Sequence, residues 1–239
     1  KKKTITKSMN NNYSISFNGE VYNYSELLNN YLSINKMGKN TTDTEVLVNL
    51  HEKINYKSIP ILLNGMFAYV VYDQNKDRLI IANDVQGEKN LYFYEDNNYF
   101  ILASTIKAIL KFTKIYHLDE TTIKNYFITR HFMPIKRTCF KSINIFENGS
   151  VNKYSLRTKK MSMEIYEKPS NWISEIKYQE YSKMKESELV DFLDFELNKQ
   201  IKIMIPKINF GCTISGGVDS SLQAAIISKY KDPYKNFVI

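Results

Sequence analysis

Cysteine and histidine are scarce in this chain of 239 residues. The two cysteines, Cys139 and Cys212, lie far apart in unrelated contexts, which argues against a disulfide framework and against a cysteine-rich zinc site. The histidines His51, His117 and His131 show no short ligand spacing. We therefore expect no metal held by imidazole or thiolate, whereas Mg²⁺ held by carboxylates stays open.

Long apolar runs are also lacking. The sequence has no stretch of about 18 apolar residues, and its lysine-rich start has neither the apolar core nor the small-residue cleavage site of a secretory signal. We therefore expect a cytoplasmic protein with no membrane partner.

Positive charge is in excess but is not concentrated. The net charge is +8, yet only "KKK" at 1–3 and "RTKK" at 157–160 are clustered. We favour a solvated basic surface over a nucleic-acid footprint, and anionic nucleotides would also suit it.

The first half of the chain reads as strands joined by turns. Five segments predict an antiparallel meander, and a last strand is expected after the turn at 147–150. The five segments are 13–17, 66–73, 78–83, 90–95 and 99–104. Together with the helical patterns around them, they predict an α+β domain.

Helix signals lie between and after these strands. One helical pattern begins at Ser25, and another follows Thr42, which has the spacing of a capping box with Glu45. Two short helices are expected at 104–112 and after Asp119, which could cap the second.

The second half changes period and predicts an α/β unit. A helical pattern runs from Glu186 until Pro206 ends it, and "NFGCTI" at 209–214 predicts a buried strand. A glycine loop, a helix from about Asp219 to Tyr230 and the strand "NFVI" complete a βαβ unit. Because one crossover cannot cover both faces of a parallel sheet, we expect the chain to be incomplete at this end.

The loop "SGGVDSS" at 215–221 has the composition of an anion site. A loop that enters a helix N-terminus presents free N–H groups and the positive end of the helix dipole. The glycines allow close approach, the serines add hydroxyl donors, and Asp219 suits Mg²⁺ beside phosphate. A capped turn without a ligand is the alternative, and local chemistry alone favours that turn.

The same loop resembles the pyrophosphate-binding loop of the N-type ATP pyrophosphatases, and its two final serines resemble the asparagine synthetases. Four upstream segments resemble the glutamine amidotransferase half of that family, in the same order. They are "FNGEVYNYSELL" at 17–28, "TDTEVLVNLHEK" at 42–53, and residues 63–93 and 126–150.

The resemblance implies a domain order. Residues 1–160 would form an N-terminal-nucleophile-type αββα amidotransferase domain that lacks its N-terminal part. Residues 161–184, which show no clear period, would be a connector. Residues 185–239 would be the start of the ATP-pyrophosphatase synthetase domain, with its first βαβ unit.

The activity implied is ATP-dependent amidation of aspartate to asparagine, with ammonia from glutamine and release of AMP and pyrophosphate. Glutamine, aspartate and ATP would be the small-molecule partners, Mg²⁺ the metal, and a homodimer is compatible with the resemblance. Two alternatives stay open: a related amidoligase similar to β-lactam synthetase with a silent amidotransferase domain, and a non-catalytic remnant that retains binding.

The resemblance assigns glutamine-site residues. The Asn18 side-chain amide and the Gly19 N–H match the oxyanion hole, Glu20 a glutamine contact, and Asp43 the carboxylate that holds the α-ammonium group. From the residues alone, Asn18 and Gly19 could equally form a plain turn, and Asp43 could be a first-turn helix charge.

The resemblance also assigns ATP-site residues. Asp219 would hold Mg²⁺, and Thr213 and Ile239, at the ends of successive strands, match positions beside the adenosine. The phosphates would lie against Ser215, Gly216, Gly217, Asp219, Ser220 and Ser221.

The sequence departs from the family pattern in places. The family's nucleophilic cysteine lies upstream of its "FNGE", so we expect that part to be missing, and neither Cys139 nor Cys212 suits the role. Asn83, Asn90 and Thr105 stand where arginine, proline and glutamate are usual. We expect the chain alone to complete neither half-reaction.

Overall fold

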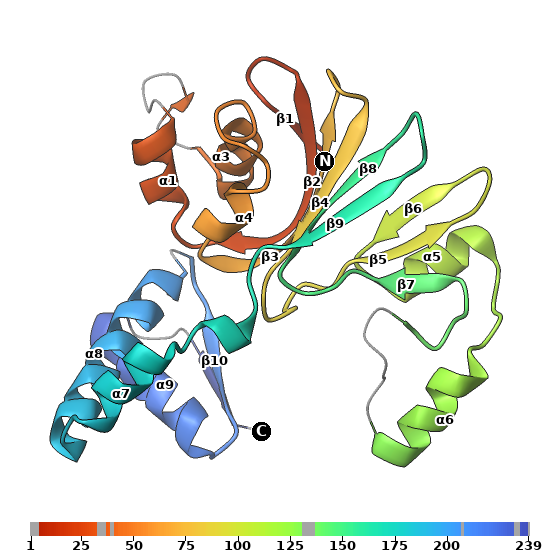
Figure 1. The fold of residues 1–239 in the computed structure, drawn as a ribbon. Coiled ribbons are helices and arrows are strands. Elements are labelled where there is room, and N and C mark those ends of the chain that lie inside the picture. The colour runs from red at the N-terminus through yellow and green to blue at the C-terminus, as the bar shows by residue number, and fades with distance from the viewer. Residues whose placement is uncertain are drawn as a thin grey trace. The chain divides into compact units, whose positions relative to one another are not determined.

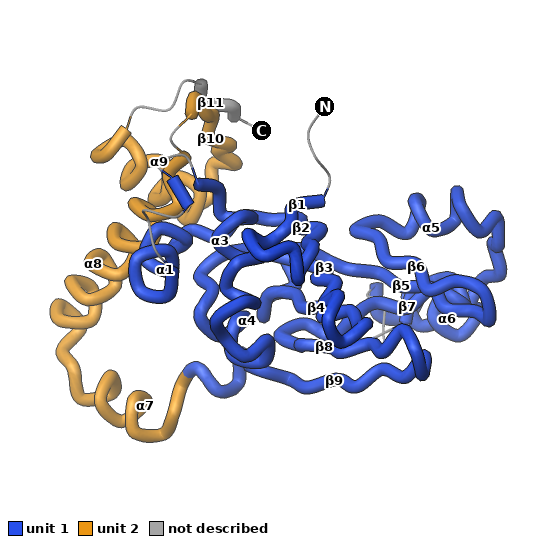
Figure 2. The backbone as a smooth tube through the Cα atoms, turned by 90° about the horizontal axis from the view of Figure 1, so that it is seen from above, with its two compact units in different colours: residues 1–172 blue, residues 173–239 orange. Residues whose placement is uncertain are grey.

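The computed structural model describes residues 5–32, 37–38, 41–130, 137–206, 208–231 and 235–238, the last four by their backbone alone. The chain forms two compact units, Lys1–Trp172 and Ile173–Ile239 (Figure 2). Among the described helices, none is both long and apolar enough to cross a membrane.

The larger sheet of unit 1 has six strands in the order β1-β2-β3-β4-β8-β9, and every neighbouring pair is antiparallel. β4 coincides with the predicted strand at 78–83, and β2 extends four residues beyond the predicted one. The strands are β1 Thr6–Lys7, β2 Tyr13–Val21, β3 Gly65–Asp73, β4 Arg78–Asn83, β8 Ser150–Ser155 and β9 Met161–Ile165.

A second antiparallel sheet has the order β6-β5-β7. Its strands are β5 Tyr92–Glu95, β6 Phe100–Ala103 and β7 Ile143–Ile145. The expectation of one meander was therefore wrong, since the chain leaves the first sheet after Asn83. β5 pairs with β7, some fifty residues further on, and local alternation carries no information on such long-range pairing.

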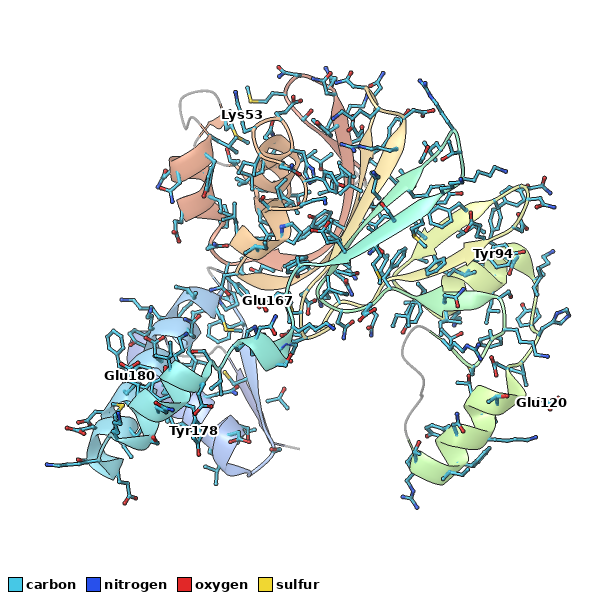
Figure 3. All side chains as sticks on the ribbon, in the orientation of Figure 1. Lys53, Tyr94, Glu120, Glu167, Tyr178 and Glu180 are labelled. Carbon is cyan, nitrogen blue, oxygen red and sulfur yellow. The ribbon has the colours of Figure 1, made fainter. Side chains whose placement is uncertain are left out.

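Helices and sheets of unit 1 stack in four layers (Figure 1). α1 (Tyr24–Tyr31), α3 (Asp43–Leu50) and α4 (Ile59–Leu62) cover one face of the six-stranded sheet, and α5 (Ile106–Thr113) covers the three-stranded sheet. Side chains alternate along β3, where Tyr69 packs toward the helices and Ala68 toward the second sheet. Tyr94, labelled in Figure 3, packs with Ile109 of α5.

Two predicted helix starts are confirmed. Thr42 and Glu45 form the capping box at the start of α3, and the Asp119 side chain accepts a hydrogen bond from Thr122 N–H at the start of α6, Glu120–Thr129. Such caps satisfy N–H groups that the first helical turn leaves free.

The first unit extends beyond the boundary predicted at Lys160. β9, Met161–Ile165, pairs with β8, and Tyr166 packs against the core and donates from its hydroxyl to the Asn83 carbonyl at 2.8 Å. The connector expected at 161–184 thus begins with a strand. Its side chains are mostly exposed, which explains why no apolar period marks it.

Unit 2 contains the predicted βαβ unit. Its elements are α7 Glu175–Ser182, α8 Glu186–Met204, β10 Gly211–Ile214, α9 Val218–Tyr230 and β11 Lys235–Val238. β10 and β11 pair in parallel. The expectation of a buried strand was wrong, because residues of β10 alternate between exposed and half-buried in a sheet of two described strands.

His51 makes the stability of unit 1 sensitive to acid. The side chain is 5% exposed, and neither ring nitrogen has a partner among the described residues. It packs between the rings of Tyr13 and Tyr69. Burial and the nearby Arg78 guanidinium lower the pKa of His51 from 6.5 to about 3.

As the pH falls, His51 is therefore protonated in the unfolded chain before it is protonated in the folded chain. The stability present above pH 6.5 is lost as the pH falls further. We expect urea unfolding to show a loss of about 2 kcal/mol between pH 7 and pH 5. His51→Leu should remove this dependence, and His117→Leu, at an exposed position, should retain it. An unchanged dependence in His51→Leu would refute the assignment.

Candidate functional site

Strand β2 leaves an edge open along the residues predicted to bind glutamine. In the part of the chain that the structure describes, β1 covers this edge only opposite Ser14 and Ile15. Phe67 of β3 lies opposite Gly19, and its backbone N–H and carbonyl both point away from β2. The N–H donates to Asp84 Oδ2 at 3.2 Å, and the carbonyl accepts from Asp84 N–H at 2.8 Å. Because N–H directions alternate along an antiparallel pair, the Gly19 N–H points to the open edge.

Gly19 occupies a conformation and a space that only glycine fits. Its φ is +148°. A Cβ added there would lie 2.1 Å from the Met66 carbonyl oxygen and 2.7 Å from Phe67 Cα. Asn18 and Gly19 lie inside β2, so the turn interpretation was wrong, and the glycine permits close approach of two strands.

Asp43, the first residue of α3, reaches the same edge. Its Oδ2 accepts from Val21 N–H at 3.2 Å, and its Oδ1 from Thr44 N–H at 2.6 Å. Val21 and Gly19 are two residues apart, so their N–H groups leave β2 on the same side. The structure thus brings the Gly19 N–H and the Asp43 carboxylate to one edge, while Asp43 also lies at the positive end of α3.

Asn18 and Glu20 lie on the face of β2 that is turned away from the helices. Asn18 pairs across the sheet with Ala68, which packs toward the second sheet, and both Asn18 and Glu20 are exposed. Burial, followed by the carboxylates of Glu20 and Glu88, raises the pKa of Tyr22. Glu20 and Glu88 therefore both lie near the Tyr22 hydroxyl.

The glycine loop of unit 2 leads into α9 without a side-chain cap at the start of that helix. Gly216 has a φ of +79°, and Gly217 is the N-cap residue, without a side-chain cap. The N–H groups of the first turn are thus left for another partner. Ser215 and Ser220 form a hydrogen bond across the loop, with 3.1 Å between their hydroxyl oxygens. The Ser220 hydroxyl also donates to the Gly217 carbonyl at 3.2 Å.

This loop fits phosphate better than it fits a metal alone. Asp219 and Ser221 are exposed in the first turn of α9. The described residues contain no group of three metal-ligating side chains, so Mg²⁺ would need phosphate and water oxygens besides Asp219. Thr213 is exposed in β10, opposite Phe237, and Ile239 lies outside the described residues.

The two cysteines lie in different units. Cys139 lines a cleft of about 700 Å³ in unit 1, together with Asn90, Tyr92 and Phe146. Burial raises the pKa of its thiol, which disfavours the nucleophilic thiolate. Cys212 lies in β10 of unit 2.

Sequence reasoning missed two residues that support the edge. Asn23 bridges to the segment before β3, donating from Nδ2 to the Leu62 carbonyl and accepting at Oδ1 from Asn64 N–H, both at 2.9 Å. Asp84 is 4% exposed and accepts three backbone N–H bonds. An aspartate directly after a strand pattern was the only available signal.

Several proteins similar to this chain are named as glutamine-hydrolyzing asparagine synthetases. A putative glutamine-hydrolyzing asparagine synthetase 2 of Methanocaldococcus jannaschii is 28% identical over 222 residues, 91% of this chain and 41% of that protein. Glutamine-hydrolyzing asparagine synthetase 1 of Bacillus subtilis is 26% identical over 95% of this chain and 34% of its own length. A probable glutamine-hydrolyzing asparagine synthetase of Schizosaccharomyces pombe is 30% identical over 93% of this chain and 34% of its own length.

This chain spans between 34% and 41% of the length of these relatives, and the resemblance to asparagine synthetases seen in the sequence motifs is confirmed. The model of the glutamine amidotransferase domain family matches residues 5–167, most of unit 1. The chain belongs to the glutamine amidotransferase domain family.

Proposed function

We propose that this chain is part of a glutamine-dependent asparagine synthetase and that the open edge of β2 forms its glutamine site. The observation that carries the proposal is the placement of the Gly19 N–H and the Asp43 carboxylate on one edge. A hydrogen-bond donor and an anion side by side match the two ends of a bound glutamine, its amide carbonyl and its α-ammonium group.

In the reaction implied by the resemblance, a cysteine thiolate attacks the amide carbon of glutamine. Negative charge develops on the carbonyl oxygen, and the Gly19 N–H and the Asn18 amide donate hydrogen bonds to it. Collapse of this intermediate, with transfer to the leaving nitrogen of the proton that the α-amino group of the cysteine took from the thiol, releases ammonia and leaves a thioester, which water cleaves to glutamate. Asp43 holds the α-ammonium group, and Glu20 contacts glutamine from the neighbouring face.

The loop at 215–221 would hold ATP. The N–H groups in the first turn of α9, which has no side-chain cap, suit phosphate oxygens, with the hydroxyls of Ser215, Ser220 and Ser221 alongside. Asp219 would share Mg²⁺ with the phosphates, and Thr213 would lie beside the adenosine. When bound, ATP activates the aspartate carboxylate, so that ammonia can displace AMP.

The full-length protein with [amide-¹⁵N]glutamine, aspartate, ATP and Mg²⁺ tests this proposal. We expect glutamate, ¹⁵N-asparagine and aspartate-dependent pyrophosphate release. Asp219→Asn should lose pyrophosphate release but still form glutamate, since the two half-reactions use different units.

Other outcomes identify the alternatives. Glutamate formation without asparagine would support an amidoligase with a different acceptor. Pyrophosphate release with another acceptor but no glutamate would support a silent amidotransferase domain. Absence of both products would contradict the proposed function and favour a remnant that only binds.

A further inference from the structure

Asp84 is a buried carboxylate whose hydrogen bonds converge from two segments. It follows β4 directly and is 4% exposed. Its Oδ2 accepts from Phe67 N–H at 3.2 Å and from Lys89 N–H at 3.0 Å, and its Oδ1 accepts from Glu88 N–H at 2.9 Å. A carboxylate held by three backbone donors has little freedom to move.

One of these donors belongs to β3, the strand that pairs with β2 on the side opposite its open edge. Phe67 is opposite Gly19, and its N–H belongs to the same peptide group as the Met66 carbonyl. That carbonyl oxygen would lie 2.1 Å from a Cβ on Gly19. The peptide group that Asp84 holds is therefore the one that packs against Gly19.

The side chain of Asp84 also supplies a hydrogen-bond acceptor that the backbone of β4 does not supply to Phe67 N–H. β4 ends at Asn83, so its backbone offers no strand partner to Phe67 N–H, and a buried N–H without an acceptor is unfavourable. The carboxylate replaces the missing partner, while Asp84 N–H donates to the Phe67 carbonyl at 2.8 Å.

We propose that Asp84 is a positioning residue for the Gly19 N–H donor. This inference rests on the proposed glutamine site. Asp84 fixes the Met66–Phe67 peptide group, this group fixes Gly19 by close packing, and the Gly19 N–H is thereby aimed at the glutamine carbonyl oxygen before the reaction begins. Donors held in place in advance contribute more to catalysis than donors that must reorient.

The test measures glutamine hydrolysis by the full-length protein with Asp84→Asn. The amide keeps one acceptor oxygen but turns an NH₂ group toward at least one N–H donor. Misplacement of a reacting group lowers catalysis strongly, so we expect kcat to fall about 10- to 100-fold while KM changes less than about threefold.

Asp73→Asn is the matched control. Asp73 is also fully buried, at the far end of β3, where it accepts from Lys76 N–H at 3.2 Å and from Arg78 Nε at 2.9 Å. It should lose stability as Asp84→Asn does, but at temperatures where both variants are folded it should keep kcat within about threefold.

Asp84→Glu keeps the charge and provides a second variant should Asp84→Asn fail to fold. The extra methylene displaces the carboxylate toward Phe67, and the same fall in kcat is expected. Equal kcat values for the Asp84 variants and Asp73→Asn would overturn the inference. A wild-type protein that hydrolyses no glutamine would instead overturn the proposed function.

Discussion

Replacing Gly19 by alanine should abolish glutamine hydrolysis and destabilise unit 1 by about 3–5 kcal/mol. The φ of +148° is unfavourable for any residue with a side chain, and the new Cβ would lie 2.1 Å from the Met66 carbonyl oxygen. Neither strand can withdraw without breaking the pairing of β2 with β3. Urea unfolding at constant pH measures the loss of stability.

Ser16→Ala is the control on the same strand. Ser16 is exposed in β2, opposite Val70, and its replacement should change stability by about 0.5 kcal/mol or less. If Gly19→Ala unfolded at the same urea concentration as Ser16→Ala, the close approach of the two strands at Gly19 would be wrong.

Replacing Asp43 by asparagine should weaken glutamine binding by about 10- to 100-fold, because the α-ammonium group loses a charged acceptor. The fold should persist, since an asparagine oxygen can still accept from Val21 N–H or Thr44 N–H. Isothermal titration of the full-length protein with glutamine measures the change.

Asp119→Asn is the matched control for Asp43→Asn. Asp119 is likewise a carboxylate at a helix start and accepts from Thr122 N–H at 3.0 Å, but it lies at α6, away from β2. It should leave glutamine affinity unchanged. Equal affinities for the two variants would mean that Asp43 is only a helix-start charge.

Local patterns predicted those elements that local interactions determine. The capping box of Thr42 and Glu45 and the cap at Asp119 are satisfied within three residues, and β4 is marked by its own apolar run. Each of these signals needs no knowledge of the rest of the chain.

The features that the sequence did not predict depend on pairing between segments that are distant along the chain. The split into two sheets follows from the pairing of β5 with β7, and the place of β9 follows from its pairing with β8. The same holds at the site: the direction of the Gly19 N–H depends on the register of β2 with β3 and on Asp84. Shifting a strand by one residue would reverse these directions.

The most direct test of the glutamine site observes the Gly19 N–H itself. This chain contains three Asn-Gly pairs, at Gly19, Gly65 and Gly149, so labelling with ¹³C-carbonyl asparagine and ¹⁵N-glycine distinguishes these amides by NMR from the other amides of this chain. Gly149 lies directly before β8, where its N–H donates to the Asp84 carbonyl at 3.0 Å, and serves as an internal control.

Titration of the labelled full-length protein with glutamine should shift the Gly19 signal strongly, the Gly65 signal weakly and the Gly149 signal not at all. A Gly19 signal that stays in place at saturating glutamine, or a shift confined to Gly149, would contradict a glutamine site at the open edge of β2.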